Sequence, residues 1–77
     1  MNRPIYQIAK EIRRDWTKLS PCAKPYLDAM DSISDIQENY IADTARDVVL
    51  RFLCNATGWR GETARRVKKE LKSLLGE

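Results

Sequence analysis

The 77-residue chain has no histidine, only two cysteines and three glycines, and no long apolar run. The lack of histidine removes the commonest general base and the commonest metal ligand. Two cysteines are too few for a zinc site of their own or for a disulfide framework. A chain this short also rarely frames a preorganised pocket. We therefore expect a protein that is not an enzyme and that holds no metal or cofactor.

Targeting segments are also missing from the sequence. The residues after Met1–Pro4 are charged and amphipathic, unlike the apolar region of a secretory signal. Apolar runs are only a few residues long, which is too short to span a bilayer. We therefore expect the protein to be cytoplasmic and to make no contact with a membrane.

What the sequence does contain is a helical pattern. Glycine and β-branched runs are scarce, which disfavours a sheet, and apolar residues recur at a spacing of about 3.6 residues. We predict helices over residues 4–19, 24–32, 42–55 and 60–75. The fold expected from them is all-α, a compact bundle of three to four helices that forms a single domain over residues 1–77.

Capping residues set the expected helix boundaries. Pro4 suits the first helical position, and Asn2 or Arg3 would then be the cap before it. Gly58 can take the positive φ that ends the third helix, and Gly76 can end the fourth in the same way.

The third helix has apolar side chains on two faces. Its main face is formed by Ala45, Val48, Val49, Phe52, Leu53 and Ala56. Leu50 and Cys54 lie on the opposite side, one turn apart. Such a helix is either central in a bundle or covered by a partner. We favour the central position, and the alternative is a homodimer or target interface around Leu50 and Cys54.

Charge is distributed unevenly along the chain. Residues 1–24 carry six basic and two acidic side chains, whereas residues 25–50 carry one basic and six acidic ones. The last segment, residues 60–77, is basic again. These segments either neutralise one another in the fold or form separate charged surfaces for partners.

The fourth helix carries a cationic stripe. Its members recur at i, i+3, i+4 and i+7, which places them on one side of a helix, and they are Arg65, Lys68, Lys69 and Lys72. A second basic flank on the first helix consists of Lys10, Arg13, Arg14 and Lys18. The two flanks either join into one binding surface or are solvated faces. Within the fourth helix, the spacing predicts ion pairs from Glu62 to Arg66 and from Arg66 to Glu70.

The two tryptophans are expected to pack in the core or at its rim. Trp59, followed by Arg60, is also a candidate interface anchor, because these two residue types dominate binding energies at interfaces. An exposed Trp59 would further offer a stacking platform for a base.

The third and fourth helices, joined by a short connection with Gly58, resemble a helix-turn-helix. This arrangement would make the chain a small nucleic-acid-binding regulator. The residues at the start of the fourth helix, however, are Arg60, Glu62, Thr63 and Arg66, rather than the set of Asn, Gln, Ser and Thr typical of a reading helix. Nucleic-acid binding is therefore the alternative hypothesis.

Three segments carry a resemblance to known proteins: FLCNATGWRGETARRVKKEL at 52–71, IAKEIR at 8–13 and PYLDAM at 25–30. Together they resemble a group of very small proteins encoded by prophages and mobile elements of Gram-positive bacteria. That group has no established activity, so the resemblance implies a context and no catalytic residues. Small phage-type proteins often bind host proteins, and inhibitors of defence nucleases such as anti-CRISPR proteins are one such class.

The expected function is therefore that of a phage-type binding protein acting on a host protein or nucleoprotein. Its partner would be bound by the anchor and the stripe together, which are Trp59, Arg60, Arg65, Lys68, Lys69 and Lys72.

Overall fold

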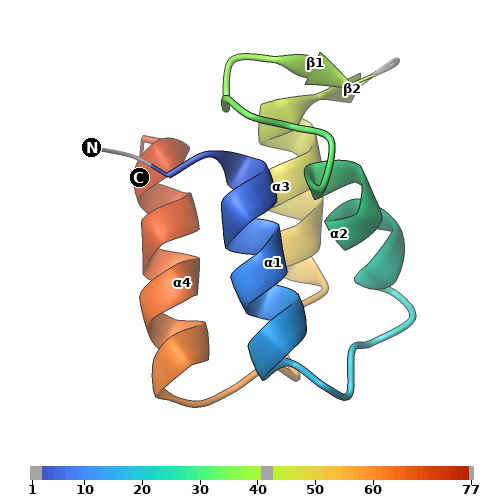
Figure 1. The fold of residues 1–77 in the computed structure, drawn as a ribbon, viewed down its shortest axis with the longest axis vertical. Coiled ribbons are helices and arrows are strands. Elements are labelled where there is room, and N and C mark those ends of the chain that lie inside the picture. Colours follow the sequence, from blue (N-terminus) through green and yellow to red (C-terminus); the bar gives the residue numbers. More distant parts are fainter. Residues whose placement is uncertain (1–2, 41–42, 77) are drawn as a thin grey trace.

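In the computed structural model, residues 3–40 and 43–76 are described. This part of the chain forms four helices around one apolar core, which confirms the expected all-α bundle (Figure 1). The helices are α1 (Ile5–Asp15), α2 (Lys24–Met30), α3 (Ala45–Cys54) and α4 (Glu62–Leu74). Two short antiparallel strands, β1 (Asn39–Tyr40) and β2 (Asp43–Thr44), lead into α3 and pair Asn39 with Thr44.

Two helices, α1 and α2, each pack against two neighbours in the bundle. Helix α1 packs against α2 and α4, and α2 packs against α1 and α3 (Figure 1). Leu50 on α3 is 39% exposed and Cys54 is exposed too, so α3 is buried on one face only. The prediction that this helix is the central one is wrong, because its second apolar face is interrupted by exposed charged residues, Asp47 and Arg51.

Every helix contributes its periodic apolar face to the core. The buried set from α1 and α4 is Ile5, Ile8, Ala9, Ile12, Ala64, Val67 and Leu71. Phe52 from α3 is fully buried, as are Leu27 and Met30 from α2. No polar or charged residue in the described part of the chain is fully buried, so the charged groups are left to the surfaces between and outside the helices.

The start of α1 is capped by backbone from elsewhere in the chain. Pro4 is the cap residue rather than the first helical residue, so the helix begins one residue later than expected, and Pro4 offers no side-chain hydrogen bond. The N–H groups of Ile5 and Tyr6 donate instead to the carbonyls of Ser34 and Ile33, at 3.0 and 2.8 Å. The expected cap Asn2 lies outside the described residues, and the other expected cap, Arg3, bonds to α4 instead.

Two further helix boundaries differ from the expected ones, the first because of tertiary packing and the second because of a backbone conformation. The first helix ends at Asp15 rather than at residue 19, since Trp16 leaves helical geometry (φ −93°, ψ 78°) and turns into the core. The fourth begins at Glu62, after Gly61, and Gly61 rather than Gly58 has a positive φ, of 114°. The expected positive φ at Gly76 is confirmed, at 87°.

The start of the third helix is also later than expected. Thr44 caps it by accepting a hydrogen bond from the N–H of Asp47 at 3.1 Å. Residues 43–44 are in the short strand rather than the helix, and residue 42 lies outside the described residues. The strand pairing therefore takes the place of the first expected helical turn.

Candidate functional site

One flank of α4 faces α1, and we call it the inner flank. Its two charged residues, Arg66 and Glu70, pair with side chains near and on α1 rather than with each other. Arg66 pairs with Glu11, and Arg3 donates two hydrogen bonds to Glu70 at 2.7 and 3.0 Å. Arg3 also lies 2.7 Å from Glu11, so the four side chains form one network. The predicted pairs within α4 are wrong, because Arg66 and Glu70 instead pair with Glu11 and Arg3 across the helix interface.

The inner network shifts the pKa of Glu11 and of Arg3, each in favour of the charged form. Burial by itself would raise the pKa of Glu11, but hydrogen bonds from Arg3 and Arg66 outweigh it and hold that pKa below its usual value. The pKa of the Arg3 guanidinium shifts in the opposite direction, because its hydrogen bonds to the Glu70 carboxylate raise it. The network therefore acts as an electrostatic tie between the two helices.

The opposite side of α4 we call the outer flank, which consists of Arg65, Lys68, Lys69 and Lys72. Helix geometry places them on one side, as expected, and none forms a salt bridge with another described residue. Arg65, Lys69 and Lys72 are exposed. Lys68 is partly buried and donates to the Trp59 carbonyl at 2.7 Å, so its described hydrogen-bond partner is neutral.

Like charges crowd around Lys68. Burial lowers the pKa of its ammonium group, and the nearby cations Lys72 and Arg60 lower it further. No described carboxylate offsets this repulsion with a salt bridge. An anion brought here from outside would therefore be attracted by several positive groups at once.

The outer flank opens onto a depression of about 290 Å³ at the start of α4. The residues that line it are Trp59, Arg60, Gly61, Ala64, Arg65 and Lys68. Three of these are cationic and none is acidic. Gly61 holds the chain in a conformation open mainly to glycine, at φ 114° and ψ −179°. The role of Gly61 was missed at the sequence level, although a glycine directly before Glu62 and Thr63 is a usable signal for a helix start.

Trp59 forms the inner wall of this depression and is only 2% exposed. Its ring stacks on that of Trp16, with centroids 5.8 Å apart and planes 10° from parallel. Its indole N–H donates to the Asp15 carboxylate at 2.8 Å. The expectation of core packing is confirmed for both tryptophans. The expectation of an exposed anchor or stacking platform is wrong for Trp59, which acts on the site through the carbonyl that holds Lys68.

The second basic flank on α1 does not form a single surface. Arg13 turns toward α2, where its guanidinium lies 2.6 Å from carboxylate oxygens of both Asp28 and Asp31. The Arg13 hydrogen bond, with a smaller effect from Lys24, holds the pKa of Asp28 below its usual range. The other members of that flank are exposed, and they are Lys10, Arg14 and Lys18. The alternative of one cationic surface joining all four to the outer flank is therefore wrong.

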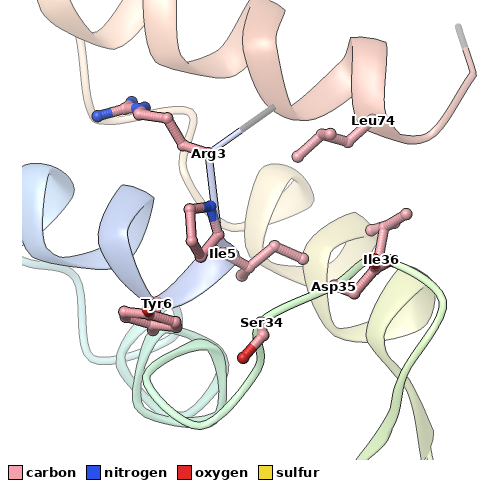
Figure 2. A pocket seen from close by; sticks show the side chains of 8 residues that line it. Arg3, Ile5, Tyr6, Ser34, Asp35, Ile36 and Leu74 are labelled. Atoms are coloured by element: carbon pink, nitrogen blue, oxygen red, sulfur yellow. The ribbon is translucent and has the colours of Figure 1, made fainter. Parts of the chain in front are cut away.

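A further cavity, of about 300 Å³, lies where the start of α1 meets residues 34–36 and the end of α4 (Figure 2). Figure 2 shows the Arg3 guanidinium pointing away from Ile36 and from Leu74, the last residue of α4. That group is already bonded to Glu70, and the first N–H groups of α1 are already bonded to backbone carbonyls. Unlike the depression at the start of α4, this cavity offers no cation without a carboxylate partner.

Comparison with known proteins adds no relative: no protein-family model, curated protein or solved structure matches the chain. The resemblance to prophage-encoded proteins therefore stays a prediction. Within residues 3–40 and 43–76, no three potential ligands among Cys, Asp and Glu side chains gather as a metal site. None of the described helices combines the length and the apolar character needed to cross a membrane. The outer flank of α4 and its depression are the candidate site.

Proposed function

We propose that this chain is a non-enzymatic binding protein of phage or mobile-element type, active in the cytoplasm. It covers an anionic surface on a host protein or nucleoprotein with the outer flank of α4. Following the resemblance, a defence nuclease is the target that we favour, and the chain would act as its inhibitor.

The observation that supports this proposal is that four cations without a described carboxylate partner lie together on one side of α4. Arg3, Arg13, Lys24 and Arg66 each pair with a carboxylate, which matches charge within the fold. On the outer flank, the described structure supplies no carboxylate to any of the four cations. Charged groups at the edge of an interface mainly set specificity and the rate of encounter, so the flank suits recognition of an acidic surface.

The helix-turn-helix alternative has less support. The connection between α3 and α4 spans residues 55–61, longer than the turn of about 3–4 residues typical of that motif. Nucleic-acid binding without that motif needs only phosphate contacts from the outer flank. Such binding can be distinguished from protein recognition by its steep dependence on salt concentration.

The proposal is tested by affinity capture from lysates of phage-bearing Gram-positive bacteria, with and without nuclease treatment. The wild-type chain is compared with the double variant Lys69→Glu/Lys72→Glu and with Lys10→Glu/Lys18→Glu as the matched control. Lys10 and Lys18 are exposed and lie outside the outer flank, so their reversal changes the net charge by the same amount without touching the site. We expect one protein or nucleoprotein to be captured by the wild type and the control, and lost in Lys69→Glu/Lys72→Glu.

The captured partner is then purified and its activity is measured with and without the chain. Inhibition of a nuclease that Lys69→Glu/Lys72→Glu fails to cause would support the inhibitor proposal. Equal capture by all three chains would contradict a role for the outer flank.

A further inference from the structure

The depression at the start of α4 has a composition found nowhere else among the described cavities. Arg60, Arg65 and Lys68 line it, and no acidic residue does. We propose that this depression is a phosphate-binding site that holds one phosphodiester group of a nucleic-acid strand. The proposal rests on the proposed function and specifies its anionic partner as the nucleic-acid component of a nucleoprotein.

The set of donors fits a phosphate better than a carboxylate. A guanidinium presents a planar fork of N–H groups that matches phosphate oxygens, and an ammonium acts as a compact point charge. A carboxylate has two oxygens, and one arginine fork can engage both. A phosphodiester offers its oxygens in several directions, so the two arginines and Lys68 can approach the same group from different sides.

The site is held in place by buried structure. Lys68 is fixed by its 2.7 Å hydrogen bond to the Trp59 carbonyl. Trp59 is fixed in turn by stacking on Trp16 and by its bond to Asp15. The Lys68 ammonium is therefore positioned before any ligand arrives, which reduces the entropy that binding would cost.

The proposed ligand is larger than a single phosphate, because the outer flank carries further cations outside the depression. Lys72 lies about 6 Å along the helix axis from Lys68, and Lys69 continues the exposed side of the flank, from a rise of about 1.5 Å per residue. A lone phosphorylated side chain would leave these exposed cations without a partner. A nucleic-acid strand brings a phosphate at every nucleotide and can engage the depression and the rest of the outer flank together.

The first test titrates inorganic phosphate into the chain at constant ionic strength, with chloride as the balancing anion, and follows backbone amide shifts by NMR. We expect saturable shifts confined to residues 59–68, and binding at least about tenfold weaker in Lys68→Met and Arg65→Gln. Lys10→Gln is the matched control and should bind as the wild type does. Absence of saturation, or equal binding by all variants, would overturn the proposed site. Circular dichroism confirms that each variant is folded.

The second test compares a short oligothymidylate with an oligoglutamate peptide of the same number of negative charges. We expect the oligothymidylate to bind more tightly than the peptide. In Arg65→Gln, the slope of log affinity against log salt concentration should become shallower by the equivalent of about one phosphate contact. Equal affinity for the two polymers would overturn the preference for phosphodiester.

The two proposals fail separately in these experiments. If phosphate and oligonucleotide bind but no host component is captured, the site stands and the host-directed function fails. If a host protein is captured through Lys69 and Lys72 while phosphate does not bind, the function stands and the phosphate site fails.

Discussion

The two flanks of α4 use similar residues for different purposes. On the inner flank, Arg66 and Glu70 are paired with Glu11 and Arg3 across the interface with α1. On the outer flank, the structure describes no carboxylate partner for the cations, and the one in closest contact with the fold, Lys68, rests on a neutral carbonyl. Arg66 and Lys72 are only six positions apart, yet helix rotation places them in unlike surroundings.

This difference shows that net charge along the sequence does not reveal how a cation is used. Paired charges on the inner flank hold two helices together, so their loss should reduce folding stability. Charges on the outer flank contribute little to the fold, so their loss should reduce binding only. The following changes test that division, from the largest expected effect to the smallest.

Trp59→Ala should destabilise the whole fold, on which both flanks depend. The Trp59 ring is buried and stacks on Trp16, and the backbone carbonyl of the same residue accepts the hydrogen bond from Lys68. Removing a buried aromatic side chain typically costs about 3–5 kcal/mol, which is most of the stability of a small domain. The measurement is urea unfolding followed by circular dichroism. Trp59→Phe keeps an aromatic ring and should lose less, and equal stability of Trp59→Ala and the wild type would contradict the described packing.

Glu11→Gln should destabilise the fold through the inner flank alone. It removes the carboxylate shared by Arg3 and Arg66, and the partly exposed setting limits the loss to about 1 kcal/mol. Urea unfolding measures the change, and phosphate titration of the same variant should match the wild type. Loss of phosphate affinity without loss of stability would reverse the assignment of the two flanks.

Acidification should act on the same carboxylate. The pKa of Glu11 is lowered on folding, so its contribution to stability is present above the unfolded value and is lost as the pH falls through the folded value. The free energy of unfolding of the wild type should therefore fall more steeply than that of Glu11→Gln between about pH 5 and pH 3. Urea unfolding at several pH values tests this, and parallel curves would show that Glu11 is not stabilised by its partners.

Lys69→Glu/Lys72→Glu should leave the fold nearly unchanged. Both side chains are exposed and form no described salt bridge, so we expect a stability change within about 0.5 kcal/mol per site. Thermal unfolding provides the check, and Lys10→Glu is the comparison on α1. A loss as large as that of Glu11→Gln would mean that the outer flank also supports the fold.

Leu50→Glu is expected to have the smallest effect. Leu50 is 39% exposed and is flanked on α3 by charged residues, which is too small an apolar surface for a stable dimer. Light scattering should give the mass of one chain for both the wild type and the variant. A doubled mass that Leu50→Glu abolishes would support the alternative of a homodimer through Leu50 and Cys54.

The faces of the helices were predictable because they depend on local spacing. Ala64, Val67 and Leu71 recur with the helical period, and all three are buried. The side of α4 that carries the cations followed from the same spacing. These features need no knowledge of what the helix packs against.

The partners of the charged residues were not predictable in this way. Arg66 has an acidic residue four positions away on either side, but its partner Glu11 is 55 residues distant, and Arg3 bonds Glu70 across 67 residues. The end of α1 was missed for a similar reason, since Trp16 leaves the helix to stack on Trp59. Both outcomes depend on tertiary neighbours that a single segment does not contain.

The way in which α1 is capped determines whether this helix can form outside the intact chain. Its first two N–H groups are satisfied by carbonyls at Ser34 and Ile33, beyond the end of α2. An isolated peptide of 11 residues is already too short to be a stable helix in water, and excision would remove this cap as well. The secondary structure of α1 is thus conditional on the assembled chain, and fragments that lack the segment after α2 should be largely random coil over residues 5–15.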